Sequence, residues 1–443
     1  MMINTSLFRV FAVATMAVLP SALAAPPLRN VMYYDDGHTT LPEDTTILQN
    51  ITHVIMSFVD PSDLYHGTSN ASTPFFKTAT EVRSHFPSET KFGFAIGGWE
   101  LTPNFNLTVD PVWRQPFVKN AVKLLDELDF DFIDVDWEYP GGDGIDYKNK
   151  AAESKKAEVD NFPLLMEELR NELNSTGKGL SIAVPGKPED IAVYKQYSAR
   201  IWNTVDFVNV MAYDLMNRRN NGTGHHASLA GANDSITDYV GKLGLNPRKI
   251  NLGFPFYAKF FELEKEYCSG PLGCRLVAAE NANGLDAFTS DTVTFEAHNY
   301  LREPAKIVAG DGLCGPSNGL RCAAGQCCSR WGYCGGTDEF CGRMCLSNFG
   351  DCHANGIYLD MVKSFQAAMD HGKFDEAERA WWYIDTQFYP RNFFWTWDTP
   401  DTIEEKITEI VKKRGLGGVM AWSLGEDSYD WARVKAMNAV ITQ

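Results

Sequence analysis

Eight short apolar runs, separated along most of the chain by segments with helical periodicity, constrain the fold more than any other feature of the sequence. The intervening segments include WRQPFVKNAVKLLDEL (113–128) and VDNFPLLMEELRNEL (159–173), whose apolar residues recur every three or four positions, as in amphipathic helices. This alternation predicts an α/β fold, and eight strands favour a closed (β/α)8 TIM barrel over an open doubly wound sheet. The eight runs are 31–34, 53–58, 91–96, 132–137, 180–184, 207–213, 250–256 and 417–422.

The spacing of the runs breaks once, between the seventh and the eighth, where about 160 residues intervene instead of the few dozen of one βα unit. We therefore expect an α+β insertion there. All ten cysteines fall between Cys268 and Cys352, and the part rich in cysteine and glycine has too few aliphatic residues to build its own apolar core. The expected organisation is a barrel with strands 1–7 at 25–257, an insertion at 258–392 with a small disulfide-rich module nested at 312–352, and barrel completion with strand 8 at 393–443.

Residues 1–24 are typical of a secretory signal peptide. Arg9 is followed by an apolar run from Val10 to Leu19 and by the small-residue pattern Ala22-Leu23-Ala24. A buried N-terminal helix is the alternative. No later stretch reaches ~18 uninterrupted apolar residues, so we expect no membrane partner and a secreted, extracellular protein. Six N-x-S/T sequons predict a glycoprotein, at Asn50, Asn70, Asn106, Asn174, Asn221 and Asn233.

The net charge of −17 disfavours nucleic acid and anionic lipid as partners and is compatible with a neutral substrate.

The run DFIDVDWEYP (131–140) carries four acids into a stretch that otherwise has the pattern of a buried strand. In a strand Asp134, Asp136 and Glu138 point to one face, with Glu138 at the carboxyl end, where barrel enzymes place their chemistry. Crowded carboxylates cannot all ionise, so one of them should keep a proton near neutral pH, as a general acid requires. A Ca²⁺ or Mg²⁺ site and a structural network of shared protons are the alternatives.

The pattern Asp131-x-x-Asp134-x-Asp136-x-Glu138, followed by Tyr139-Pro140, resembles the signature of family 18 glycoside hydrolases, the chitinases. Further motifs agree in order, and the resemblance spans residues 29–440. These motifs are IGGW (96–99), DNFPLLMEELR (160–170), MAYD (211–214), GFPFY (253–257) and GLGGVMAWSL (415–424).

This resemblance implies a retaining, substrate-assisted hydrolysis of β-1,4-linked N-acetylglucosamine, without metal or cofactor. Glu138 would be the general acid, Asp136 would orient the substrate's acetamido group, and Asp134 would share a proton with Asp136. Tyr213 would donate to the acetamido carbonyl, with Asp214 nearby. Trp422 would form the floor under the sugar, with a core tryptophan as the alternative. Cleft walls are implied for Trp99, Tyr33, Phe58, Met211 and Tyr257, each of which could equally be barrel packing.

Three positions depart from the family pattern. Ala95 stands where a serine usually helps to hold the inner aspartate, Phe132 replaces a common glycine, and Tyr257-Ala258-Lys259 replaces Tyr-Gly-Arg. Glu138, which inactive chitinase-like lectins typically lose, is present. A chitin-binding lectin with little or no turnover is therefore the alternative function. A toxin-like or heteromeric role and the cleavage of N-glycan cores are weaker alternatives.

The eight cysteines of 314–352 resemble a hevein-type chitin-binding module, although spacing alone allows 105 pairings. The secreted context favours disulfides over zinc. The resemblance implies the pairs Cys314–Cys328, Cys322–Cys334, Cys327–Cys341 and Cys345–Cys352, which leaves Cys268 and Cys274 to pair locally. Sugar would lie on Trp331, Tyr333 and Phe340, with a hydrogen bond from Ser329; packing of these rings on the barrel is the alternative. Chitin and chitooligosaccharides are the expected partners of a chain assumed to be monomeric.

Overall fold

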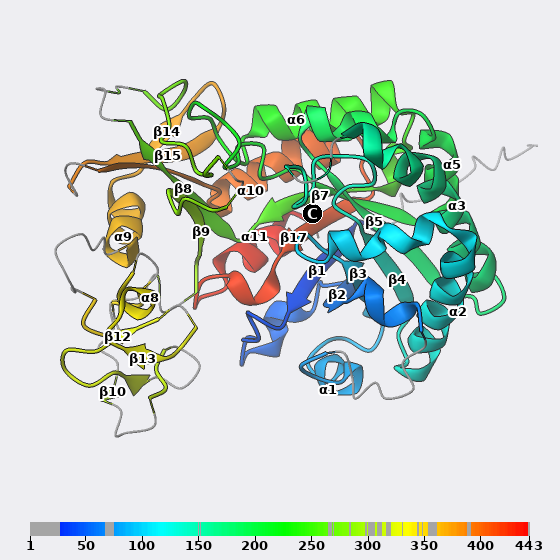
Figure 1. Cartoon of the computed structure of the whole chain (residues 1–443), viewed down its shortest axis with the longest axis horizontal. Helices are drawn as coiled ribbons and strands as arrows, with labels where there is room; N and C mark the ends of the chain where they lie inside the picture. Colours follow the sequence, from blue (N-terminus) through cyan, green and yellow to red (C-terminus); the bar gives the residue numbers. More distant parts are fainter. Residues whose placement is uncertain are drawn as a thin grey trace, which may run out of the picture.

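Figure 1 shows the computed structural model of the chain, a barrel with an insertion at one side. The structure describes residues 27–66, 75–148, 150, 152–264, 268, 270–282, 285–296, 299, 306–307, 312–315, 320–329, 331–342, 345–347, 349–352, 361–387 and 391–441. The predicted signal peptide and the Asn70 sequon lie outside the described residues.

Eight parallel strands close into a barrel in the order β1-β17-β7-β6-β5-β4-β3-β2, which confirms the predicted TIM barrel and excludes the open sheet. Every predicted run forms one of these strands, and the first strand closes the barrel against the last. The strands are β1 Arg29–Asp35, β2 His53–Val59, β3 Lys91–Gly97, β4 Phe132–Asp136, β5 Gly179–Pro185, β6 Phe207–Met211, β7 Ile250–Pro255 and β17 Gly418–Trp422.

Helices cover the outside of the barrel. The two segments predicted from periodicity form α2 (Pro111–Glu127) and α3 (Lys156–Leu173), whose buried faces pack in one apolar layer between strands and helices. The others are α1 Ala79–Arg83, α4 Pro188–Ile191, α5 Ser198–Thr204, α6 Leu229–Thr237, α10 Pro400–Lys406 and α11 Ala432–Ile441. None of the helices in the described part of the chain is long and apolar enough to cross a membrane.

The insertion is built on a five-stranded antiparallel sheet with the order β14-β15-β16-β8-β9, packed against α9 (Met361–His371). Its strands are β8 Tyr257–Leu263, β9 Ser290–Thr294, β14 Lys373–Asp375, β15 Ala380–Asp385 and β16 Asn392–Trp397. The expected boundary at 392/393 therefore falls inside β16, because an antiparallel partner of β8 cannot be told from a barrel strand by its apolar pattern. We propose residues 257–397 as the insertion, with the module still at 312–352.

The module consists of short elements beside α9, drawn in yellow in Figure 1. They are β11 Leu320–Arg321, the antiparallel pair β12 Cys327–Cys328 and β13 Cys334–Gly335, and α8 Asp338–Cys341. Just before the module, β10 Lys306–Ile307 pairs in parallel with β11.

Candidate active site

The acids of β4 point into the barrel. Ile133, Val135 and Trp137 join the outer apolar layer, and the Trp137 ring stacks on Phe105 at 4.9 Å and 6°. The alternation of a strand therefore turns Asp134, Asp136 and Glu138 toward the barrel axis. Asp136 and Glu138 line a cavity of about 720 Å³ at the carboxyl ends of the strands.

Asp134 is fully buried and is held by two hydroxyl groups. Tyr33 Oη donates to Oδ2 at 2.6 Å, and Ser181 Oγ donates to Oδ1 at 2.5 Å. Burial raises the pKa of Asp134 to about 6, although the hydrogen bonds from Ser181, Tyr33 and Asn209 oppose this rise. Asp134 therefore titrates near neutral pH.

Ser181 explains how the site accommodates Ala95. Both residues lie beside Asp134 in the barrel sheet, Ala95 on β3 and Ser181 on β5. In the family pattern a serine at the position of Ala95, on β3, supplies a hydroxyl to the inner aspartate. Here Ser181 supplies that hydroxyl from β5. Phe132, the second departure, is accommodated because Gly93 leaves room for its ring: a Cβ on Gly93 would lie 2.4 Å from that ring.

Asp136 has a buried oxygen without a partner. Within the described part of the chain, Oδ1 of Asp136 accepts no hydrogen bond, although the residue is only 3% exposed. Burial, together with the charges of Glu138 and Asp134, raises the pKa of Asp136 well above its usual value. Asp136 also lines the cavity, so its carboxyl group is available to an N–H donor from a ligand there.

Glu138 follows β4, and the loop after β3 holds its backbone. Its N–H donates to Thr102 Oγ1 at 2.9 Å, and Thr102 in turn donates to the carbonyl of Gly98 at 3.0 Å. Burial and the charges of Asp214 and Asp190 raise the pKa of Glu138 to about 8, against a hydrogen bond from Tyr139. A carboxyl group that stays protonated at neutral pH can act as a general acid.

Gly97 permits the close contact between β3 and β4. Its φ is +108°, and a Cβ on it would lie 2.5 Å from the carbonyl oxygen of Asp136. The next residue, Gly98, donates its N–H to that same carbonyl at 2.7 Å. The two glycines of the IGGW motif thus set the position of the acidic strand.

Asp214, after β6, is the centre of a charged group at the rim. Lys259 Nζ lies 2.9 Å from its Oδ2, Tyr257 Oη donates to Oδ1 at 2.9 Å, and His226 lies 3.6 Å away. Burial opposes its ionisation, but Lys259 and His226 hold the pKa of Asp214 below its usual value. Asp214 is therefore a fixed negative charge near Glu138, and Lys259 is the third departure from the family pattern.

Aromatic rings surround the acids. Trp422 stacks on Phe58 at 5.3 Å and 16° and contacts Tyr33 at 5.5 Å. Tyr213 lies beside Tyr257, and its hydroxyl makes a long contact of 3.8 Å with the sulfur of Met420. The predicted residues that line the cavity are Asp136, Glu138, Tyr213, Trp422, Asp214, Met211, Trp99, Phe58 and Tyr257; Asp134 and Tyr33 lie beneath it.

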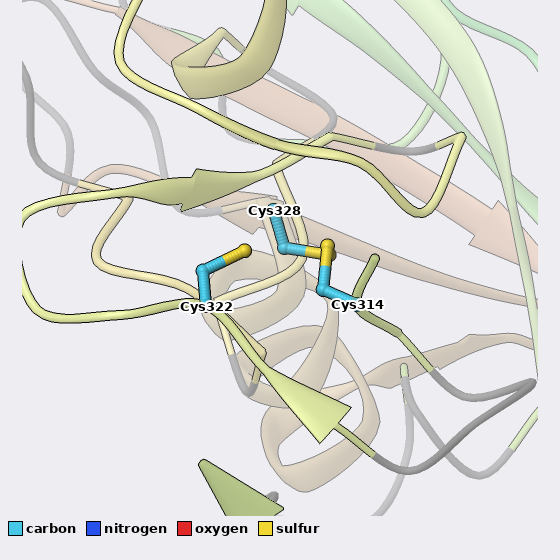
Figure 2. Close-up of side chains that lie close together, drawn as sticks. All are labelled: Cys314, Cys322 and Cys328. Atoms are coloured by element: carbon cyan, nitrogen blue, oxygen red, sulfur yellow. A yellow bond between two sulfur atoms is a disulfide. The ribbon is translucent and has the colours of Figure 1, made fainter. Parts of the chain in front are cut away.

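The module is held by its disulfides, four of the five in the structure. Figure 2 shows the bond between Cys314 and Cys328, with Cys322 close by. The pairs are Cys268–Cys274, Cys314–Cys328, Cys322–Cys334, Cys327–Cys341 and Cys345–Cys352, as the resemblance implied.

Two of the four predicted sugar-binding residues of the module are strongly exposed. Trp331 is 72% exposed and Tyr333 55% exposed, which argues against packing of these rings on the barrel. Ser329 is buried and accepts a hydrogen bond from the N–H of Tyr333, and Phe340 packs beside the disulfides. Exposed rings on so small a module are typical of a binding face.

One cysteine group in the described residues has the spacing of a metal site. The sulfur atoms of Cys314, Cys322 and Cys328 lie within 4.8 Å of one another, but all three cysteines are in disulfides. A disulfide sulfur is not the thiolate that a metal requires.

The sequence profile described as Glycosyl hydrolases family 18 matches residues 29–427. The chain belongs to this family. Endochitinase 1 of Metarhizium robertsii is 27% identical to this family 18 chain, over 90% of the chain and 81% of that protein. Probable chitinase 2 of Drosophila melanogaster is 33% identical over 41% of the chain and 36% of its own length.

Solved structures agree with the fold of this family 18 protein. The Group IV chitinase of Ostrinia furnacalis aligns with a TM-score of 0.61 at 20% identity, over 94% of this chain and all of that one. The class V chitinase of Nicotiana tobaccum, as an E115Q mutant in complex with NAG4, aligns with a TM-score of 0.61 at 17% identity, over 94% of this chain and 99% of that one.

Three residues of the family 18 site were not among those predicted from the sequence. Ser181 and Asn209 are polar residues inside apolar strand runs, and this is the signal that could have identified them as partners of Asp134. Lys259 was noted as a departure, but only the structure pairs it with Asp214.

Proposed function

We propose that the protein is a secreted chitinase that hydrolyses β-1,4 linkages of N-acetylglucosamine polymers with retention, by a substrate-assisted mechanism. The observation that carries the proposal is that the carboxyl groups of Asp136 and of the general acid Glu138 line the same cavity. The Asp136 carboxyl group can accept the acetamido N–H of a substrate bound there. Asp134, which accepts hydrogen bonds from the hydroxyls of Tyr33 and Ser181, would share a proton with Asp136.

The reaction begins when Glu138 gives its proton to the glycosidic oxygen. The acetamido carbonyl oxygen of the substrate attacks the anomeric carbon as the leaving sugar departs, and an oxazolinium ion forms. Asp136 accepts the acetamido N–H and stabilises the positive ring, while Tyr213 donates to the carbonyl oxygen. Glu138 then takes a proton from water, which opens the ring on the original face. The configuration at the anomeric carbon is therefore retained.

The aromatic residues supply the sugar-binding surfaces. Trp422, held by Phe58 and Tyr33, offers a flat ring at the end of β17 on which the C–H face of a pyranose stacks. In the module, Trp331 and Tyr333 form a second chitin-binding face. Five disulfides fit an oxidising, extracellular location, and the sequons in the described residues are candidate glycosylation sites.

The experiment that tests this function compares wild type with Glu138→Gln on chitin oligosaccharides, alongside a chitin pull-down. We expect wild type to release short oligomers with initial β configuration, and the variant to bind while losing about 10²–10⁴-fold in rate. Glu172→Gln, an exposed carboxyl on α3, is the matched control and should be fully active. Binding of chitin by wild type without cleavage would instead support the lectin alternative.

A further inference from the structure

Loops from separate strands meet over the cavity in a cluster of five residues, which we call the clasp: Tyr147, Lys148, Arg218, Arg219 and Glu280. Tyr147 and Lys148 follow β4, the two arginines follow β6, and Glu280 belongs to the insertion. Tyr147, Arg218, Arg219 and Glu280 line the same cavity as Glu138. The clasp therefore joins the barrel to the insertion next to the reacting groups.

Glu280 is the centre of the clasp. The Tyr147 hydroxyl donates to its Oε2, and Lys148 Nζ lies 2.9 Å from the same oxygen. Arg218 Nε lies 2.9 Å from Oε1. The Glu280 side chain is only 6% exposed, whereas the side chains of Lys148 and Arg218 are 31% and 34% exposed. A buried carboxylate with one hydrogen bond and two ion pairs is a more stable contact than an isolated surface ion pair.

Arg219 extends the clasp to the loop after β3. Its guanidinium lies 5.2 Å from the centre of the Tyr147 ring and 5.9 Å from the centre of the Trp99 ring, and it donates to the carbonyl of Asp143 at 3.0 Å. These contacts connect the loops after β3, β4 and β6. In the barrel, β5 lies between β4 and β6. The clasp joins the loops that follow β4 and β6, so it lies on the β5 side of the cavity, where Gly186 and Lys187 form part of the lining.

We infer that the clasp determines which bonds of the polymer are cleaved, by closing the β5 side of the cleft. A closed side prevents an uninterrupted polysaccharide from lying across the acids, so only a chain end or a short oligosaccharide reaches Glu138. The inference rests on the proposed function and adds a residue-level cause for the choice between chain-end and interior cleavage.

The test measures two rates on a soluble chitin derivative, the loss of viscosity and the formation of reducing ends, together with chitotetraose hydrolysis. Wild type should form reducing ends with little early loss of viscosity. With Glu280→Ala, viscosity should fall several-fold faster per reducing end formed, and chitotetraose should still be hydrolysed. Lys148→Ala removes an ion pair at an exposed position and should also raise the ratio of viscosity loss to reducing-end formation. This variant tests the inference if Glu280→Ala does not fold.

Glu405→Ala is the matched control, because it breaks an ion pair of 2.9 Å with Arg379 that lies outside the cavity. Its ratio of viscosity loss to reducing-end formation should equal that of wild type. An early viscosity loss in wild type, or a ratio unchanged in both clasp variants, would overturn the inference. Failure of wild type to hydrolyse chitotetraose would refute the proposed function instead, so the two failures are distinguishable.

Discussion

At the scale of single residues, Asp214 and Lys259 place a paired charge beside the general acid. The Asp214 carboxylate raises the pKa of Glu138, and the Lys259 ammonium keeps Asp214 ionised. The pH range in which Glu138 keeps its proton is therefore set partly by a neighbouring loop, and partly by burial, which is the larger cause.

The first prediction concerns pH. In the free protein the pKa of Glu138 is about 8, so kcat/KM should fall as pH rises through about 8, because the general acid loses its proton. Asp214→Asn removes a negative charge that favours the protonated form, so its alkaline limb should lie at lower pH. The measurement is kcat/KM against pH on chitotetraose. An unchanged limb in Asp214→Asn, with Glu172→Gln as the neutral control, would contradict this assignment.

The second prediction concerns the support of Asp134. Ser181→Ala removes a hydrogen bond of 2.5 Å, so Asp134 should titrate at higher pH and the protein should lose about 1 kcal/mol in the free energy of unfolding. Ala95 lies on the strand at the other side of Asp134. Adding Ala95→Ser to Ser181→Ala should therefore restore much of the hydrolysis rate that Ser181→Ala loses. Rate and denaturant unfolding check both effects. A double variant no better than Ser181→Ala would show that the two positions are not equivalent.

At the scale of elements, the strands that form the barrel were predictable from sequence because each is apolar and bounded by polar loops. The α+β insertion was also expected, but the start of its sheet was not, since β8 starts at Tyr257, two residues after β7 ends at Pro255, without a change in apolar pattern. Asp134, Asp136 and Glu138 were found because charge in an apolar strand is conspicuous. The clasp was not predicted, because a contact between residues 133 positions apart leaves no local pattern in the sequence.

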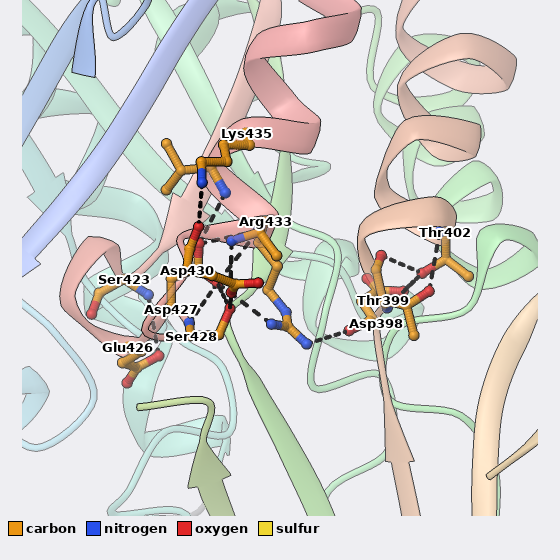
Figure 3. Close-up of polar contacts among 12 residues, drawn as sticks. Asp398, Thr399, Thr402, Ser423, Glu426, Asp427, Ser428, Asp430, Arg433 and Lys435 are labelled. Carbon is orange, nitrogen blue, oxygen red and sulfur yellow. Dashed lines mark hydrogen bonds and ion pairs between the residues drawn. The ribbon is translucent and has the colours of Figure 1, made fainter. Parts of the chain in front are cut away.

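The third prediction concerns α11, which holds the loops where the insertion meets the barrel. Figure 3 shows Arg433 directed at Asp427 and at the carbonyl of Asp398, and its guanidinium also covers the Phe295 ring. Arg433→Met leaves the buried Asp427 without its cation, so the free energy of unfolding should fall by about 3–5 kcal/mol.

Lys435→Met is the matched control on the same helix. Its ammonium donates to the carbonyl of Asp430 at an exposed position, so we expect a change within about 0.5 kcal/mol. Denaturant unfolding measures both variants. Equal losses in the two variants would mean that the Arg433 network does not stabilise the junction.

At the scale of the whole molecule, the cysteines lie in the proposed chitin-binding module and the rest of the insertion, apart from the barrel strands. All ten are in the insertion and none is in the barrel strands, so reduction should unfold the module and leave the barrel folded. A reducing agent should therefore abolish binding to insoluble chitin through the module, while chitotetraose hydrolysis continues. Trp331→Ala with Tyr333→Ala should reproduce the binding loss without reduction. Loss of hydrolysis before loss of binding would contradict this independence.

The pairing of β1 with β17 also has a consequence for synthesis. When β7 leaves the ribosome, seven strands can assemble, but the edges of β1 and β7 lack the strand that separates them in the finished barrel. That strand follows after about 160 residues, a delay on the order of 10 s at usual elongation rates. Unpaired edges are templates for aggregation. The nascent chain must therefore keep two sheet edges shielded, by chaperones or by its own folding insertion, until β17 emerges.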